Sequence, residues 1–71
     1  MRPSDQANFD AMYRTHHSAV RRCVASFGLP RSLWQDILQD TWITAFRRID
    51  ALVAHPRPVA WLCTVARNCA M

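Results

Sequence analysis

The 71-residue sequence contains no lysine, no glutamate and a single glycine. All nine basic residues are arginine and all five acidic residues are aspartate, which leaves a net charge of +4. A small positive domain favours an anionic partner, such as nucleic acid or an acidic protein surface, although a merely basic domain fits the charge equally well. The sequence also lacks a basic-then-apolar leader and an apolar run of about 18 residues. We therefore expect a cytosolic chain with no signal peptide and no membrane insertion.

Catalytic and metal-binding patterns are also missing. The three cysteines, Cys23, Cys63 and Cys69, are odd in number and include no CxxC pair, so neither a disulfide framework nor a zinc site is predicted. We expect them to be small apolar fillers in a reducing compartment, with Cys23 and Cys69 buried. His16 and His17 are adjacent and diverge by about 100° on a helix, so they cannot chelate one ion. With no nucleophile or glycine loop, the sequence predicts neither an enzyme nor a cofactor.

Helical periodicity dominates what is present. Apolar residues recur at steps of three and four, and the pattern breaks at residues 28–30, G-L-P, and at residues 54–58, A-H-P-R-P. These features predict an all-α, compact three-helix domain over residues 1–71, with helices at about 4–27, 33–49 and 58–70. Ser32 followed by Gln35 forms a capping-box pattern at the start of the second helix. On the third helix, Leu62, Val65, Ala66 and Cys69 form the expected core stripe.

The loop between the second and third helices mixes apolar residues with His55 and Arg57. Two interpretations fit it: a cover for the core, or a cradle for a flipped base with apolar walls and a few donors. Several polar residues allow a similar choice between a solvated surface and one that contacts phosphates and bases. They are Arg47, Arg48, Arg57, Arg67 and Asn68.

Three motifs together resemble one family. Residues 36–42, D-I-L-Q-D-T-W, resemble the sigma-factor pattern D-L-hydrophobic-Q-E-T-F, and residues 61–68, W-L-C-T-V-A-R-N, resemble the helix W-L-x-x-I/V-A-R-N of the extracytoplasmic-function (ECF) group. Residues 9–17, which begin with Phe9 and contain Tyr13-Arg14, are similar to that group's opening F-x-x-L-Y-R-x-H. Because they occur in the family's order and with similar spacing, the chain resembles the promoter-melting region 2 domain of a bacterial sigma factor.

The resemblance implies two partners and a residue set for each. The second helix would bind the beta-prime clamp coiled coil of RNA polymerase core through Asp36, Gln39 and Asp40. Residues 50–58 would form a specificity loop that captures a base flipped from the non-template strand of the promoter minus-ten element. Trp61 would buttress that loop rather than stack on a base. An anti-sigma factor is a further implied partner. The implied DNA-binding residues are His55, Arg57, Thr64, Arg67 and Asn68.

Some features depart from the family or leave alternatives open. Asp40 replaces the usual glutamate and Trp42 the usual phenylalanine, which weakens the inference of the clamp contact. The family's helix-turn-helix domain, which reads the minus-35 element, lies outside these residues, so we expect a longer protein. The alternatives are another helical DNA-binding regulator, which needs a short turn before a base-reading helix, and a protein-interaction module that binds no DNA. The breaks in the pattern do not give the spacing of such a turn cleanly, and a protein-interaction module explains the acidic face and the aromatic core but not the helix with Arg67 and Asn68.

Overall fold

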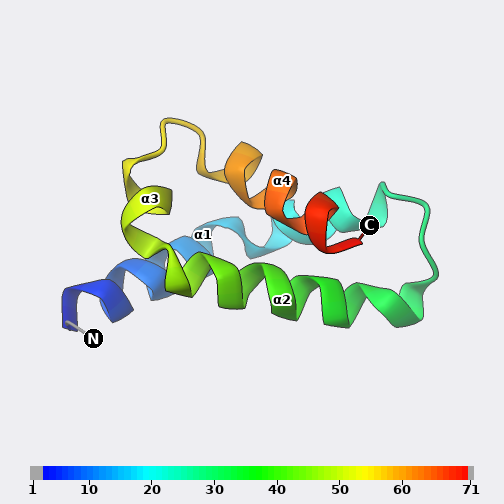
Figure 1. The fold of residues 1–71 in the computed structure, drawn as a ribbon, viewed down its shortest axis with the longest axis horizontal. Helices are drawn as coiled ribbons and strands as arrows, with labels where there is room; N and C mark the ends of the chain where they lie inside the picture. The colour runs from blue at the N-terminus through cyan, green and yellow to red at the C-terminus, as the bar shows by residue number, and fades with distance from the viewer. Residues whose placement is uncertain (1–2, 71) are drawn as a thin grey trace.

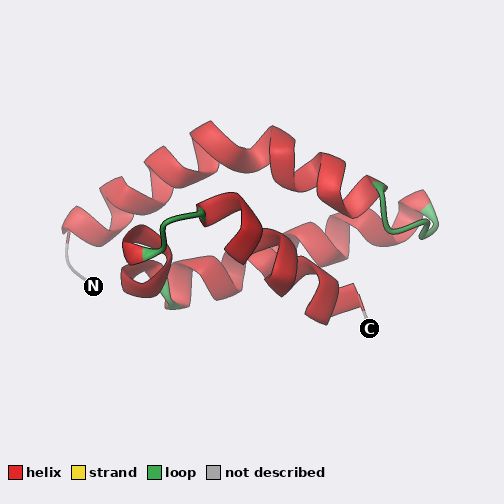
Figure 2. Ribbon diagram, turned by 90° about the horizontal axis from the view of Figure 1, so that it is seen from above, coloured by secondary structure: helices red, strands yellow, loops and turns green. Residues whose placement is uncertain are grey.

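A computed structural model of the chain describes residues 3–70, and helices form nearly all of that part. The elements run in the order α1 (Pro3–Ala25), a 3-10 turn η1 (Arg31–Leu33), α2 (Trp34–Arg47), α3 (Ile49–Ala54) and α4 (Pro58–Ala70) (Figure 1). The described residues contain no strand, which confirms the prediction of an all-α fold. The long helices α1, α2 and α4 pack on one another, and α3 closes one end (Figures 1 and 2).

The short helix α3 is the main difference from the expected architecture. Its residues 50–54 fall within the segment predicted to be a loop, its first residue, Ile49, was predicted to end the second helix, and only residues 55–57 of the predicted loop lie outside helices. The backbone of Arg48, at φ −119° and ψ 38°, leaves the helical region and turns the chain after α2. Ile49 and Leu52 then face the core from one turn of helix, and their burial stabilises an element too short to be stable alone.

The start of α2 also differs from the prediction. Ser32 lies inside the 3-10 turn, and no side chain caps the first turn of α2, so the predicted capping box does not form. The indole of Trp34 instead donates a hydrogen bond of 3.1 Å from Nε1 to the Leu29 carbonyl. Gly28, with φ at 75°, lets the chain reverse between α1 and this turn. An indole anchor thus fixes the α1–α2 connection.

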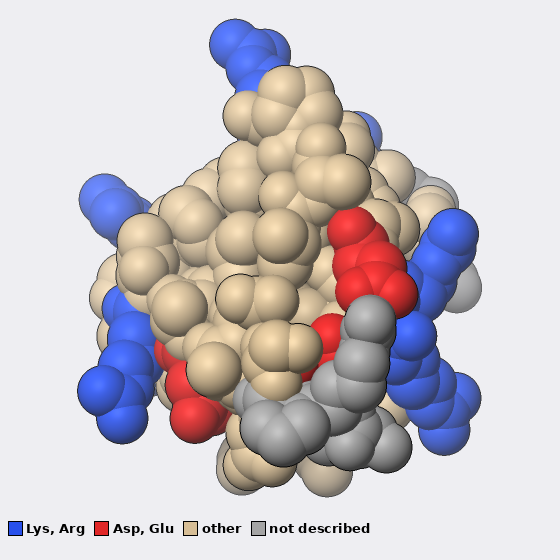
Figure 3. Space-filling view, turned by 90° about the vertical axis from the view of Figure 1, so that its left-hand side faces the viewer, with Lys and Arg blue, Asp and Glu red and all other residues tan. Residues whose placement is uncertain are grey.

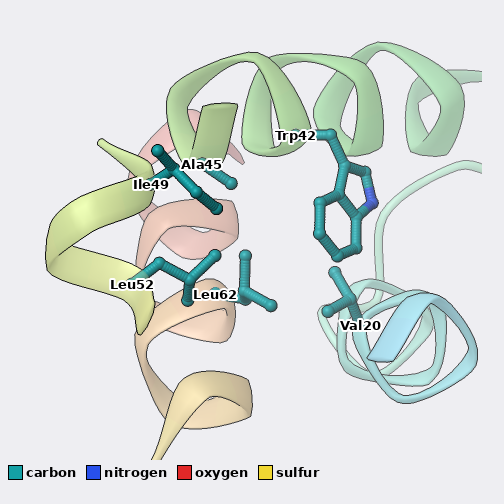
Figure 4. Close-up of a cluster of buried hydrophobic side chains, with 6 residues drawn as sticks. All are labelled: Val20, Trp42, Ala45, Ile49, Leu52 and Leu62. Carbon is teal, nitrogen blue, oxygen red and sulfur yellow. The ribbon is translucent and has the colours of Figure 1, made fainter. Parts of the chain in front are cut away.

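Two clusters of buried apolar side chains join the helices. The main core cluster lies toward α3 and combines side chains from all four α-helices: Val20, Trp42, Ala45, Ile49, Leu52 and Leu62 (Figure 4). The second core cluster, Val24, Ile37 and Ala66, joins the three long helices. Thr41 is fully buried among these apolar groups, and its hydroxyl donates a 2.7 Å hydrogen bond to the Ile37 carbonyl. This bond satisfies the hydroxyl without a partner from another helix.

The core stripe of α4 follows a different row from the expected one. Leu62 and Ala66 are buried as predicted, but Cys69 is exposed, and the expectation that it is buried is wrong. The row continues to Ala70, which packs against the second core cluster. The residues of α4 that contact the core are therefore spaced four apart, at positions 62, 66 and 70, and position 69 lies off this buried row. The thiol nearer the core on this helix is Cys63, which is half-buried.

Candidate functional site

A hollow of about 360 Å³ opens where the end of α2, the α3–α4 connection and α4 meet. Three of the residues implied to bind DNA, His55, Thr64 and Asn68, line it together. They come from the extended connection and from successive turns of α4, where positions 64 and 68 share a face. The remaining lining residues are Arg48, Ala60, Trp61 and Val65. We call this feature the α4 hollow.

The polar groups of the α4 hollow have defined hydrogen-bonding roles. The backbone N–H of Arg57 donates to Nδ1 of His55 over 3.0 Å. Because Nδ1 accepts, a neutral His55 carries its proton on Nε2 and can donate from that atom. The Thr64 hydroxyl donates to the Ala60 carbonyl at 2.9 Å, so its lone pairs remain to accept. Asn68 adds an amide with both functions, and the hollow therefore offers donors and acceptors side by side.

Trp61 and Arg48 supply an apolar wall and a positive charge to the same hollow. Trp61 is half-buried and packs against the main core cluster, and part of it lines the hollow; its role as a buttress of the loop stays a prediction. Arg48 lies at the break between α2 and α3. The adjacent Arg47, the last residue of α2, lines a separate groove.

Not all the implied DNA-binding residues meet at the hollow. Arg57 and Arg67 are exposed and lie outside its lining. Arg57 contacts the hollow only through the backbone bond to His55, and Arg67 lies near the Cys63 thiol, one turn back on α4. The implied set omitted Arg48 and gave Trp61 no contact with DNA. The sequence carried a signal for Arg48 in the Arg47-Arg48 pair, but which arginine faces α4 depends on where α2 ends.

A second concavity, which we call the α1–α2 groove, has a volume of about 1010 Å³. Phe9, Tyr13 and His17 stack along α1, with ring centroids 6.4 Å and 5.5 Å apart. Trp42 meets Tyr13 edge-on at 4.9 Å, and Phe46 meets Phe9 at 5.1 Å. None of the five aspartates lines the groove. Three arginines do: Arg21, Arg31 and Arg47.

The residues implied to contact polymerase are all exposed on α2. Gln39 lines the α1–α2 groove, but Asp36 and Asp40 do not. The two aspartates are one helical turn apart and therefore form a short acidic strip beside the groove. This side of the domain combines an aromatic groove, a glutamine and two carboxylates, and its chemistry differs from that of the α4 hollow.

Charge is distributed around the molecule rather than in one patch. Viewed from the end that α3 occupies, the arginine side chains project from the rim of a mainly uncharged surface (Figure 3). Arginine side chains are thus available on more than one face.

Over residues 3–70, no group of three or more His, Cys, Asp or Glu side chains is placed to hold a metal ion. No helix in this part of the chain is long and apolar enough to cross a membrane.

Comparison with known proteins defines the class of this fold. The family model for Sigma-70 region 2 matches residues 12–71, which include the whole lining of the α4 hollow and all of the α1–α2 groove except Phe9. The chain therefore belongs to the Sigma-70 region 2 family, as the three motifs indicated. It is 33% identical over 64 residues to the RNA polymerase sigma factor NccH of Alcaligenes xylosoxydans xylosoxydans. That alignment covers 90% of this chain but 34% of NccH, so the chain spans about a third of its relative's length. No solved structure matches the chain.

Proposed function

We propose that this sigma-factor domain binds RNA polymerase core and, in the bacterial cytoplasm, helps to melt the promoter minus-ten element. The α4 hollow is the observation that carries the DNA-binding part of this proposal. Its volume of about 360 Å³ lies near the lower end of the range for small-ligand sites, about 300–1,000 Å³, which suits one planar base. A base can enter only after it leaves the duplex stack, so binding favours the melted state.

The polar groups of the hollow suit a nucleobase edge. His55 can donate from Nε2, Thr64 can accept, and Asn68 can do both, so a base edge with alternating functions finds partners there. The wall that Trp61 provides gives the base an apolar surface, and Arg48 can pair with the adjoining phosphate. Opening a base step costs a few kcal/mol, roughly, and these contacts help to offset that cost.

The second proposed function, polymerase binding, fits the exposed side of α2. Asp36 and Asp40 can meet basic side chains of the clamp coiled coil, and Gln39 reaches the rim of the α1–α2 groove. The aromatic lining of that groove offers the apolar contact area that interfaces concentrate at their centre. One domain can therefore contact a protein with one side and a strand with another.

Replacing Asn68 with alanine tests the base-binding role. We expect Asn68→Ala to weaken binding of a minus-ten single strand by about 1–3 kcal/mol, and of a scrambled strand much less, because the amide contacts base edges. Fluorescence anisotropy with both strands measures this difference. Asn8→Ala, the same change at an exposed position of α1, is the matched control.

Two results would oppose the proposal. If Asn68→Ala lowers the melting temperature and leaves the preference between strands intact, Asn68 only stabilises the fold. If the unmodified domain shows no preference between the strands, even when held on polymerase core, the hollow does not read a base. Because isolated affinity is weak when a domain normally works on a larger assembly, the comparison between strands decides the question.

A further inference from the structure

Two cysteines from different helices lie at the same level of the α1–α4 contact. Before them along the two helices, Val20 and Leu62 both belong to the main core cluster, and after them Val24 and Ala66 both belong to the second core cluster. The two helices run in the same direction (Figure 1). Cys23 and Cys63 fall between these pairs, and both are half-buried. Packing of the flanking side chains therefore places the two cysteines at the same level of this contact.

The two thiols also interact. Burial, followed by a hydrogen bond that the Cys63 thiol donates to Cys23 and by the charge of a Cys23 thiolate, raises the pKa of Cys63 from 9.0 to about 12, while Arg67 acts in the opposite direction. At neutral pH Cys63 is accordingly protonated and a poor nucleophile. The resting pair is therefore two reduced thiols in contact.

We propose that Cys23 and Cys63 form a peroxide-sensitive thiol pair that closes into a disulfide between α1 and α4. In the first step the Cys23 thiolate attacks hydrogen peroxide, an S–O bond forms, the O–O bond breaks, and hydroxide leaves. In the second step the Cys63 thiolate attacks the sulfenic sulfur, the S–S bond forms, and the S–O bond breaks as hydroxide leaves. The released protons combine with the two hydroxides. Two thiols thus lose two electrons, and one peroxide becomes two waters.

Oxidation of Cys23 prepares Cys63 for the second step. Two of the three causes that raise the pKa of Cys63 come from Cys23, namely the hydrogen bond and the thiolate charge. A sulfenic acid is neutral, so the repulsion by a Cys23 thiolate is absent in the second step. Arg67 remains one turn away on α4, where it stabilises the Cys63 thiolate. The Cys63 thiolate therefore forms beside a neutral sulfenic acid and a nearby guanidinium.

Cys69 cannot replace either partner in the folded chain. It is six residues beyond Cys63 on the same helix, which separates the two by about 9 Å along the axis and about 120° around it. Its side chain is exposed, away from α1. In the unfolded chain we expect the Cys63–Cys69 disulfide to form in preference to Cys23–Cys63, because closing the short 63–69 loop costs less entropy than closing the 23–63 loop.

Oxidation of the 71-residue chain by hydrogen peroxide, with and without urea, tests the proposal. Peptide mapping by mass spectrometry identifies the bonded cysteines. Without urea we expect an intrachain Cys23–Cys63 disulfide, and in urea we expect Cys63–Cys69 to predominate. A native product that contains Cys69, or one that carries sulfinic acid or interchain bonds and no Cys23–Cys63 disulfide, would overturn the proposal.

Single substitutions sharpen the result. Cys69→Ser changes an exposed residue, and this variant should still close the pair and release it on reduction. Its melting temperature should rise by on the order of 10 °C on oxidation, because the disulfide constrains the unfolded chain. Cys23→Ser and Cys63→Ser should form no native intrachain disulfide. An oxidised Cys69→Ser chain that melts at or below the temperature of the reduced chain would show that the folded state does not accommodate the bond.

Discussion

At the scale of single residues, His55 has two separate tasks. Its Nδ1 atom accepts the Arg57 N–H and so shapes the connection between α3 and α4, while Nε2 is left for a ligand in the α4 hollow. The two ring nitrogens can be imitated one at a time. An asparagine amide reaches the position of Nδ1, and a glutamine amide reaches the position of Nε2.

We predict opposite effects for the two amide substitutions of His55. His55→Asn should keep the bond to the Arg57 N–H and the melting temperature, but it should reduce the preference for a minus-ten strand. His55→Gln should keep more of that preference, while loss of the exposed backbone bond costs about 0.5–1 kcal/mol and lowers the melting temperature by about 4 °C. Thermal melts and strand anisotropy measure the two effects. If both variants lose preference and stability together, His55 does not divide its tasks in this way.

At the scale of elements, α2 should carry the contact with polymerase. We predict that Gln39→Ala combined with Asp40→Arg weakens binding to a beta-prime coiled-coil fragment by about 1–3 kcal/mol, because a basic partner then faces an arginine. Isothermal titration calorimetry measures the affinity, and circular dichroism checks that the helix content is unchanged.

A charge reversal elsewhere separates a local contact from a general change in charge. Asp10 is exposed on α1 and lines neither concavity. Asp10→Arg alters the net charge as Asp40→Arg does, so it should leave the affinity for the coiled coil nearly unchanged. Equal weakening by both reversals would remove the α2 face from the interface.

The elements also show what could be predicted from the sequence. The periodicity of apolar residues correctly predicted three long helices, since the buried rows of α1 and α2 repeat at helical spacing. It did not predict α3, because six residues are too few to show a period and this helix depends on burial of Ile49 and Leu52. Likewise, Cys69 and Ala70 are both apolar, and which one faces the core depends on how α4 crosses its neighbours.

The candidate site also contains residues that the sequence predicted and one that it did not. Motif similarity identified three residues that line the α4 hollow, His55, Thr64 and Asn68. It did not include Arg48, whose place in the lining follows from the backbone break between α2 and α3. Contacts that depend on where one helix ends and another begins are set by tertiary packing, and local sequence carries little information on them.

At the scale of the whole molecule, positive charge serves more than one surface. Arg48 lines the α4 hollow, and Arg57 lies beside it, whereas Arg21 lines the α1–α2 groove between other helices. Each arginine that neutralises a phosphate releases condensed counterions, so the salt dependence of strand binding counts such contacts. A non-specific attraction that depends on net charge would treat all three arginines alike.

We therefore predict that position, and not net charge, determines the salt dependence of strand binding. For a single strand, Arg48→Ala and Arg57→Ala should each reduce the slope of log K against log salt by about 0.7, whereas Arg21→Ala should leave it unchanged. Arg57→Ala keeps the backbone N–H that donates to His55, so its effect reports on the guanidinium alone. Fluorescence anisotropy titrations at about four salt concentrations measure these slopes. Equal reductions for all three variants would mean that the strand responds only to the overall positive charge, and that the α4 hollow does not position it.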